Sequence, residues 1–162
     1  MNNDNSVFLG TAFRAAMLAG EHIRTNLGKI SKDDINTKQA SDFVTRIDRE
    51  SEQIILDTIK KKFADHHFLA EESVRKDAAG EHRWIIDPLD GTTNFIHGYP
   101  VFSVSIALEV KNEVILGLVY DPLRDEIFSA EKGKGAFLNG KPVRVSSVSD
   151  LMNSLVATGF PF

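Results

Sequence analysis

Residues 84–98 have the sequence Trp-Ile-Ile-Asp-Pro-Leu-Asp-Gly-Thr-Thr-Asn-Phe-Ile-His-Gly. The apolar start of this stretch predicts a short buried strand, and two acids, Asp87 and Asp90, stand at its end. Gly91 then leads into a short helix, which Gly98 is expected to end. A buried strand that ends in acids, followed by a loop entering a helix, supplies the groups that a site for divalent metal ions and phosphate needs.

Short strands are predicted on both sides of this stretch, and most of them follow it. Residues 101–120 form two apolar runs joined by a tight connection at residues 111–113, which is typical of a β-meander. Asn139-Gly140 between two further runs is a strong hairpin signal. The predicted strands are residues 67–70, 84–86, 101–108, 114–120, 126–130, 136–138, 143–145 and 154–158.

Two amphipathic helices are predicted before the strands. Apolar residues recur at helical spacing from Val7 to Leu27, and a second helical face runs from Phe43 to Phe63. Residues 31–41 between them are polar and aperiodic. Two helices followed mostly by strands predict one layered α+β domain over residues 1–162, with the helices packed on a predominantly antiparallel sheet.

Composition and charge exclude several classes of protein. The chain has 162 residues, no cysteine and a formal net charge of −4. The absence of cysteine excludes a disulfide framework, a thiolate nucleophile and a cysteine zinc site, and it fits a cytoplasmic location. Basic residues are spread along the chain, so nucleic-acid binding through a basic face is not expected. No apolar run approaches the roughly 20 residues of a membrane span, and no secretory signal is visible.

More acids are expected near Asp87 and Asp90. Glu71 and Glu72 end the preceding predicted strand, so they lie beside the two aspartates if the two strands are neighbours. Asp48 on the second helix is a further candidate. Grouped carboxylates repel one another unless cations lie between them, so this set favours a site for a hard divalent cation such as Mg²⁺.

The residues that follow Asp87 suggest both a further metal ligand and a phosphate site. Pro88 turns the backbone, so that the carbonyl of Leu89 can point inward as a ligand. The amides of residues 91–93 at the start of the short helix favour a phosphate oxygen. Ordinary turn chemistry is the alternative, in which Asp90 only caps that helix. Residues 121–123 repeat Asp-Pro-Leu without Gly-Thr-Thr and are predicted to form only a turn.

Three motifs occur in order and together closely resemble the inositol monophosphatase family. They are Asp-Phe-Val-Thr-x-x-Asp at residues 42–48, Glu-Glu-Ser at residues 71–73 and the long motif at residues 84–95. Residues 119–122 and 157–161 also resemble bacterial members. The resemblance implies a helix and sheet sandwich of the inositol monophosphatase and fructose-1,6-bisphosphatase type, with an antiparallel sheet covered by the two amino-terminal helices.

The resemblance also implies a metal site with two or three Mg²⁺ ions. Glu71, Asp87 and the carbonyl of Leu89 would hold the first ion, and Asp87 and Asp90 would share the second. Glu71 would also serve a third, weaker ion.

Catalytic and phosphate-binding roles follow from the same resemblance. Asp48 and Thr92 would orient or activate the attacking water, and Glu71 would assist beside them. The amides of Gly91, Thr92 and Thr93 would hold the phosphate group, with Glu71 close to it.

The implied activity is hydrolysis of a phosphate monoester by a metal-activated water, with inositol monophosphate as the first candidate substrate. Fructose bisphosphate, histidinol phosphate and adenosine bisphosphate are alternatives within the enzyme class. A non-catalytic fragment, or a regulatory relative that binds a protein partner, is the alternative from another class, because some bacterial relatives act in the transcription machinery. Family members are commonly homodimers.

The resemblance leaves one expected ligand unmatched. Family members continue into a carboxyl-terminal α/β half with a Trp-Asp-x-Ala-Ala-Gly motif, whose aspartate binds metal. The only tryptophan of this chain is Trp84, and no acid follows Asp150. The sequence is therefore expected to be an amino-terminal portion that ends before this half.

Overall fold

The computed structural model describes residues 4–31, 35–39, 42–73 and 80–158. Residues 159–162, which complete the last match to bacterial family members, lie outside the described residues. The helices are α1 (Asp4–Asn26), α2 (Arg46–Lys60) and α3 (Thr92–Ile96), with a short 3-10 helix, η2 (Leu151–Asn153). The strands are β1 (Ile35–Gln39), β2 (Asp42–Thr45), β3 (His67–Ala70), β4 (His82–Asp90), β5 (Ser103–Val110), β6 (Glu113–Asp121), β7 (Glu126–Glu131), β8 (Gly135–Leu138) and β9 (Lys141–Val143).

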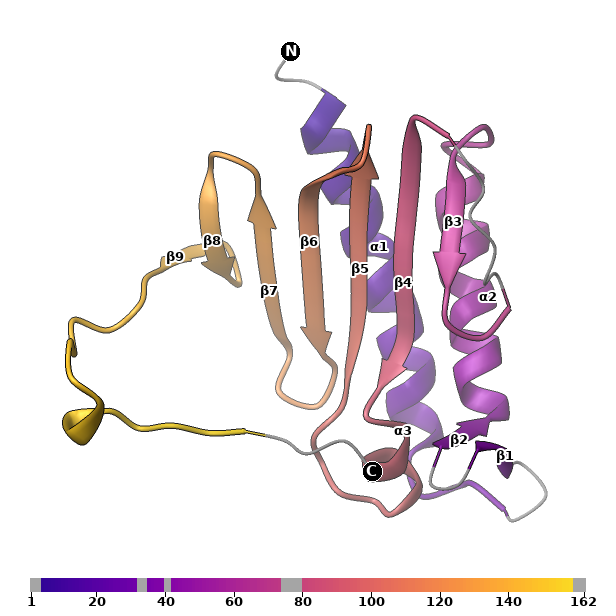
Figure 1. Cartoon of the computed structure of the whole chain (residues 1–162). Coiled ribbons are helices and arrows are strands. Elements are labelled where there is room, and N and C mark those ends of the chain that lie inside the picture. Colours follow the sequence, from indigo (N-terminus) through magenta and orange to yellow (C-terminus); the bar gives the residue numbers. More distant parts are fainter. Residues whose placement is uncertain (1–3, 32–34, 40–41, 74–79, 159–162) are drawn as a thin grey trace.

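A large sheet and two helices form two layers, as Figure 1 shows, and the β1-β2 hairpin, α3 and the segment after β9 lie outside them. One layer is a seven-stranded sheet with the order β3-β4-β5-β6-β7-β8-β9, and the other consists of α1 and α2. Helix α1 packs against β5 and β6, and α2 packs against β4. The layered α+β fold predicted from the sequence is confirmed.

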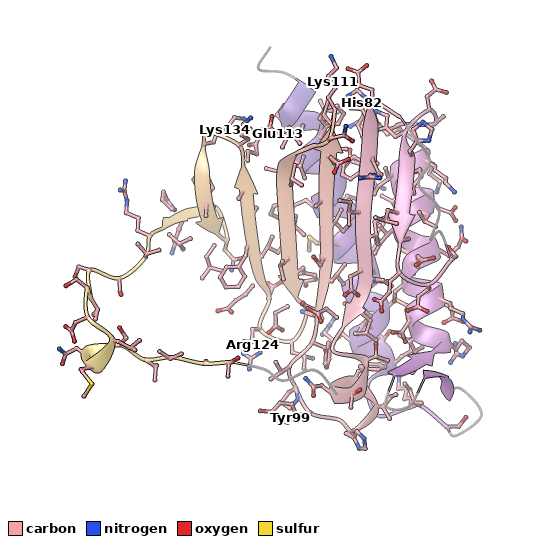
Figure 2. The ribbon with its side chains drawn as sticks, viewed as in Figure 1. His82, Tyr99, Lys111, Glu113, Arg124 and Lys134 are labelled. Carbon is pink, nitrogen blue, oxygen red and sulfur yellow. The ribbon has the colours of Figure 1, made fainter. Side chains whose placement is uncertain are left out.

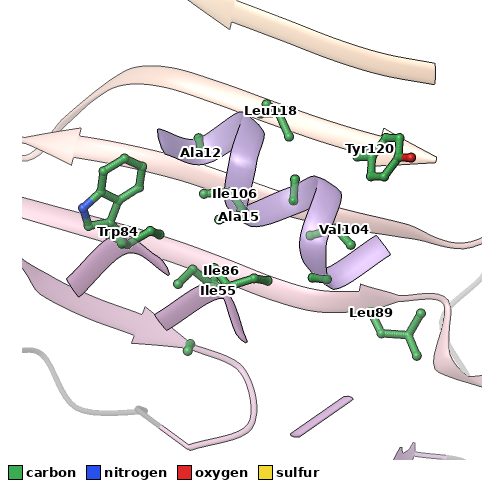
Figure 3. Packing of buried hydrophobic residues seen from close by; sticks show 14 of the residues in the cluster. Ala12, Ala15, Ile55, Trp84, Ile86, Leu89, Val104, Ile106, Leu118 and Tyr120 are labelled. Atoms are coloured by element: carbon green, nitrogen blue, oxygen red, sulfur yellow. The ribbon is translucent and has the colours of Figure 1, made fainter. Parts of the chain in front are cut away.

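The core lies between these two layers because the sheet strands alternate in burial. Val104, Ile106 and Leu108 on β5 are fully buried, while the residues between them are only partly buried. Small residues on α1, among them Ala12 and Ala15, face this row and let the helix approach the sheet closely (Figure 3).

Strand pairing places the ends of β3 and β4 side by side. These two strands are parallel, with Ala70 opposite Ile86, whereas the other pairs in the large sheet are antiparallel. The amide of Glu71 donates to the carbonyl of Ile86 at 3.2 Å, which ties the residue after β3 to β4. The acids at the two strand ends therefore lie at the same edge, as the sequence predicted.

A bulge shapes the end of β4. Asp87 lies opposite Ser105 and Asp90 lies opposite Ser103, so three steps along β4 match two steps along β5. Pro88 stands inside this irregular segment, where its missing N–H removes no regular ladder bond. The bulge changes the direction in which the two aspartates project from the strand.

The start of the second helix was predicted too early. Residues 42–45 form β2, which pairs with β1, and α2 begins only at Arg46. Thr45 stops the helix from extending backward, because its extended backbone and its side chain form a capping box with Asp48. Strand β1 itself lies in the segment that had appeared only polar and aperiodic.

The strand predicted at residues 154–158 is wrong. These residues are irregular and exposed, and Leu155 has no buried side-chain surface. A strand needs a neighbour to satisfy its backbone, and the described sheet ends with β9. The predicted hairpin at Asn139-Gly140 is confirmed, with both residues at positive φ, although its second strand covers residues 141–143 rather than 143–145.

Among the described helices, none combines the length and the apolar character that crossing a bilayer would need.

Candidate functional site

The candidate site lies at the edge where β3 and β4 end and where α2 and α3 begin. Figure 1 shows α3 directly below the end of β4, with β2 and the start of α2 at the same end of the molecule. Charged residues such as Lys111, Glu113 and Lys134 lie at the opposite end of the sheet (Figure 2). The structure assembles the predicted residues here in two groups, one around Asp48 and one around Asp87.

Asp48 is a buried carboxylate with a full set of hydrogen-bond donors. It is 1% exposed and stands in the first turn of α2. Its Oδ2 accepts the amide of Thr45 at 2.8 Å and the hydroxyl of the same residue at 2.5 Å. Burial raises the pKa of Asp48, and the hydrogen bonds from Thr45 and Thr92 act against this rise. The position of this carboxylate is therefore fixed by the start of the helix.

Thr92 connects Asp48 with the end of β4. Its hydroxyl lies 2.7 Å from Asp48 Oδ1 and 3.0 Å from the carbonyl oxygen of Leu89. A hydroxyl has a single hydrogen, so it can donate fully to only one of these two acceptors at a time. Two residues that are 44 positions apart in the sequence thus meet, as their predicted shared role requires.

Asp87 belongs to the second group, which is a cluster of acids. Burial raises the pKa of Asp87 to about 8, together with the charge of Glu71, a hydrogen bond with Glu71 and the charge of Asp90. The amide of Leu89 donates to Asp87 Oδ1 at 3.2 Å, and this hydrogen bond by itself lowers the pKa of Asp87. These surroundings favour the protonated form of the Asp87 carboxyl when no cation is bound.

Asp90 is close enough to influence Asp87 by its charge, but it stands apart from the tightly linked pair. Its side chain is exposed, at the last position of β4. In the described part of the chain, histidine, aspartate and glutamate side chains form no group of three that could hold a metal ion as they are arranged. Glu71 and Asp87 are the acids that the structure joins directly, with Asp90 beside them.

The donor set nevertheless fits a hard divalent cation. The acids at the ends of β3 and β4 offer only oxygen atoms, which Mg²⁺ prefers, and the carbonyl of Leu89, between Asp87 and Asp90 in the sequence, is a further oxygen donor. Burial and the charges of Glu71 and Asp90 raise the pKa of Asp87, and a bound cation would offset the repulsion among these acids.

The alternative in which Asp90 only caps the short helix is wrong. The N-cap residue of α3 is Gly91, and no side chain accepts a hydrogen bond there. Gly91 has φ +95°, and a Cβ at this position would lie 3.0 Å from the carbonyl oxygen of Val101. The position therefore requires glycine, and no side-chain cap takes up the amides at the start of α3.

Residues 121–123 confirm the predicted contrast between the two Asp-Pro-Leu segments. Asp121 Oδ1 accepts the amides of Leu123 and Arg124 at 2.9 and 3.0 Å, which makes a closed turn. Burial alone would raise the pKa of Asp121, but hydrogen bonds from Arg124 outweigh burial, and the pKa of Asp121 is lowered. The same tripeptide thus has a basic neighbour here and acidic neighbours at Asp87.

Sequence reasoning missed Glu52, which belongs to the site by its contacts. This glutamate lies one turn after Asp48 on α2 and is 2% exposed. Its carboxylate accepts the amide of Glu72 at 2.8 Å and the hydroxyl of Ser73. The spacing of four residues from Asp48 on one helix face was the available signal.

Comparison with known proteins gives the family to which the whole sequence is similar. The model of the inositol monophosphatase family matches residues 4–162. Nus factor SuhB of Vibrio cholerae is 44% identical over 155 residues, which cover 95% of this chain and 58% of that protein. The chain therefore spans less than two thirds of the length of this curated relative.

Solved structures match the fold as well. The extragenic suppressor protein SuhB of Bartonella henselae superposes with a TM-score of 0.79 at 41% identity, over 86% of this chain and 54% of that one. An IMPase of Thermotoga maritima gives a TM-score of 0.80 at 38% identity, over 88% of this chain and 54% of that one. Because the family model covers nearly the whole sequence, this chain belongs to the inositol monophosphatase family.

Proposed function

We propose that this chain carries the metal-binding and water-activating part of a Mg²⁺-dependent phosphomonoesterase, with inositol monophosphate as its first candidate substrate. The observation that carries the proposal is the position of two carboxylate groups on either side of Leu89. Asp48 is linked to Thr92 on one side, and Asp87 is paired with Glu71 on the other. Hydrolysis of a phosphate ester needs both a proton acceptor and a site of concentrated positive charge.

The acids at the strand ends would hold the cations. Glu71, Asp87 and the carbonyl of Leu89 are proposed for one Mg²⁺, and Asp87 with Asp90 for a second. Bound Mg²⁺ supplies positive charge that lowers the pKa of water and stabilises the charge on the phosphoryl group. Family membership supports Mg²⁺ as the cation, and the oxygen-only donor set agrees with it.

Asp48 and Thr92 would take the proton of the attacking water. The Thr92 hydroxyl donates to Asp48 Oδ1, so its oxygen has a lone pair available for a water on its other side. When that water loses its proton to Thr92, the proton of Thr92 moves to Asp48. The raised pKa of Asp48 makes this carboxylate a better acceptor than an exposed aspartate.

The start of α3 would orient the phosphate group. The first amides of a helix have no partner within the helix, and here they follow Asp90 directly. We propose that the amides of Gly91, Thr92 and Thr93 bind phosphate oxygens, with Glu71 close to the same group.

Phosphate release by a chimaera tests this function. Residues 1–162 are joined to the carboxyl-terminal part of the Thermotoga maritima protein, which supplies the length that this chain does not span. We expect Mg²⁺-dependent release from inositol monophosphate. Asp90→Asn should lower the rate by about 100-fold or more, because losing several kcal/mol of charge stabilisation in the transition state corresponds to such a factor.

Asp121→Asn is the matched control, because Asp121 begins the second Asp-Pro-Leu segment and binds Arg124 instead of other acids. The control should release phosphate at the rate of the unsubstituted chimaera. Fructose bisphosphate, histidinol phosphate and adenosine bisphosphate form the comparison panel for substrate choice. An Asp90→Asn variant that keeps its full Mg²⁺-dependent rate contradicts the assignment.

Binding of a transcription partner is the second candidate function. The observation that favours it is the name Nus factor carried by the 44% identical relative. Copurification of the chain with RNA polymerase of its own organism tests this role. If equal amounts of the polymerase are recovered with the unsubstituted chain and with Asp90→Asn, partner binding does not need the acid cluster. If no polymerase is recovered with either chain, the transcription role is rejected.

A further inference from the structure

Glu52 has an unusual environment for a carboxylate. It is 2% exposed, and both of its oxygens accept hydrogen bonds. Oε2 accepts the amide of Glu72 at 2.8 Å, and Oε1 accepts the hydroxyl of Ser73. Burying an ionised carboxylate is costly unless such donors compensate it. A carboxylate held in this way has a defined position and few remaining directions for a metal ion.

The two donors lie in the segment that carries Glu71. Glu72 and Ser73 follow Glu71 directly, after the end of β3. On the other side, the amide of Glu71 is held by the carbonyl of Ile86 on β4 at 3.2 Å. The backbone around Glu71 is therefore fixed from two directions, by α2 through Glu52 and by the neighbouring strand.

Helix α2 thus contacts both halves of the site. Asp48 in its first turn accepts the Thr92 hydroxyl, and Glu52 one turn later accepts the Glu72 amide. Residues four positions apart lie on the same face of a helix, so one rigid element sets both groups. Such outer hydrogen bonds orient metal ligands, and their loss typically weakens metal binding by about 10-fold to 100-fold.

We propose that Glu52 is a positioning residue, which holds residues 71–73 so that the Glu71 carboxylate faces Asp87 and binds Mg²⁺ together with it. The proposal rests on the proposed function, because it assigns Glu71 and Asp87 to the metal. We assign Glu52 to positioning and not to ligation, because its side chain is buried and each of its oxygens already accepts a hydrogen bond from the segment that carries Glu71.

Calorimetric titration of the 162-residue chain with Mg²⁺ tests the proposal without an activity assay. Glu52→Ala should weaken Mg²⁺ binding by about 10-fold or more. Glu52→Gln should bind within about 3-fold of the unsubstituted chain, because its amide oxygen still accepts the Glu72 amide and its NH₂ group can donate to the Ser73 hydroxyl. Glu50→Gln is the control on the same helix, since Glu50 is bound by His22 and Arg46 outside the acid cluster.

Several results would overturn the assignment. The first is a Glu52→Ala chain that binds Mg²⁺ as tightly as the unsubstituted chain does. The second is a Glu52→Gln chain that binds as weakly as Glu52→Ala, which would mean that the charge of Glu52 matters and not its position. The third is an unsubstituted chain that binds no Mg²⁺. If Glu52→Ala does not fold, Ser73→Ala decides. This variant removes only one of the two hydrogen bonds, so it should still fold and should weaken binding several-fold. Unchanged binding by a folded Ser73→Ala chain rejects the proposal.

The chimaera separates this proposal from the proposed function. There, Glu52→Ala should raise the Mg²⁺ concentration for the half-maximal rate by the same factor, with the rate at saturating Mg²⁺ changed by less than about 3-fold. If the chimaera releases no phosphate but Mg²⁺ binding follows the expected order, the proposed function fails and the role of Glu52 stands. If phosphate is released but Mg²⁺ dependence is unaffected by Glu52→Ala, the role of Glu52 fails alone.

Discussion

Asp87 and Asp121 show how neighbours decide the chemistry of one residue type. Both precede Pro-Leu, and both accept the amide of the leucine two positions later. Burial and the acids Glu71 and Asp90 raise the pKa of Asp87, whereas Arg124 outweighs burial and lowers the pKa of Asp121. The tripeptide sets the hydrogen bond to the leucine amide, and the surrounding charged residues determine which form of the carboxylate is favoured.

The raised pKa of Asp87 predicts a pH-dependent stability of the metal-free chain. An aspartate has an ordinary pKa of 3.8, and in the folded chain that of Asp87 is about 8. Between these values only the folded chain binds the proton, so stability falls as pH rises, by at most about 1.4 kcal/mol per pH unit for one group. Thermal denaturation between pH 5 and 8 measures this slope, and Asp87→Asn should reduce it.

Asp121→Asn is the control for this measurement. In the unsubstituted chain the pKa of Asp121 is lowered by folding. The stability that Asp121 contributes is therefore present above the ordinary pKa of an aspartate, and it is lost only as pH falls through the lower pKa of the folded chain. The slope between pH 5 and 8 should therefore stay as it is in the unsubstituted chain. Adding Mg²⁺ should flatten the slope of the unsubstituted chain, because the cation replaces the proton. An Asp87→Asn variant with an undiminished slope would contradict this account.

Sequence reasoning reached those residues that lie within the recognised motifs. The acids at the end of β4 and the pair of Asp48 with Thr92 were predicted from motif order and family resemblance. Glu52 was missed because it lies outside these motifs, and its partners, Glu72 and Ser73, are 20 and 21 residues away in the chain. Its spacing of four residues from Asp48 puts both acids on one face of α2, but only the fold shows that this glutamate is buried.

At the scale of the elements, α3 depends on one glycine. Gly91 has φ +95°, and the backbone of Val101 and Phe102 lies against its Cα. Gly91→Ala should destabilise the chain by about 2 kcal/mol, because a left-handed conformation costs a residue with a Cβ about 1 to 2 kcal/mol and the contact with backbone adds to it. Chemical denaturation measures the change, and weaker Mg²⁺ binding should accompany it, since Asp90 directly precedes Gly91.

Gly98 provides the matched substitution at the other end of the same helix. It also has a positive φ, +68°, but a Cβ there would meet nothing within 4 Å. Gly98→Ala should cost only the conformational part, about 1 kcal/mol, and leave Mg²⁺ binding unchanged. Equal losses of stability in the two variants would show that the contact with residues 101 and 102 contributes nothing.

Element boundaries were predicted less well than element types, and Thr45 shows why. Phe43 and Val44 continue the apolar spacing of α2, but they belong to β2, and the capping box of Thr45 with Asp48 starts the helix afterward. Apolar spacing alone cannot separate two residues of a strand from the first turn of a helix. The strand predicted at residues 154–158 also rested on apolar spacing alone. Such spacing does not show whether a neighbouring strand is present, and residues 154–158 are irregular in the structure.

At the scale of the whole molecule, the two layers were predictable because each element repeats its pattern several times. The parallel pairing of β3 with β4 followed only from the structure, yet it brings Glu71 beside Asp87. The other face of the sheet carries Val119, Phe128 and Val143, which are each about 40% exposed in the described part of the chain. A single face is thus sealed by α1 and α2.

The close contact between α1 and the sheet gives a prediction for the whole fold. A Cβ on Gly20 would lie 2.4 Å from Cε1 of Tyr120 and 3.1 Å from Cβ of Pro122. Tyr120 is 7% exposed and donates its hydroxyl to Asp125 at 3.2 Å, so its ring has little room to move. Gly20→Ala should therefore push the layers apart and lower the free energy of unfolding by about 1 to 3 kcal/mol.

Gly10 on the same helix gives the opposite expectation. A Cβ at Gly10 would meet nothing within 4 Å, so Gly10→Ala should raise the free energy of unfolding by about 0.5 to 1 kcal/mol through helix propensity alone. Urea denaturation of the two variants, compared with the unsubstituted chain, measures both changes. Stabilisation by both substitutions would mean that the helix layer does not rest on Tyr120 as closely as the structure shows. Opposite signs would establish that Gly20 sets the distance at which α1 covers the sheet.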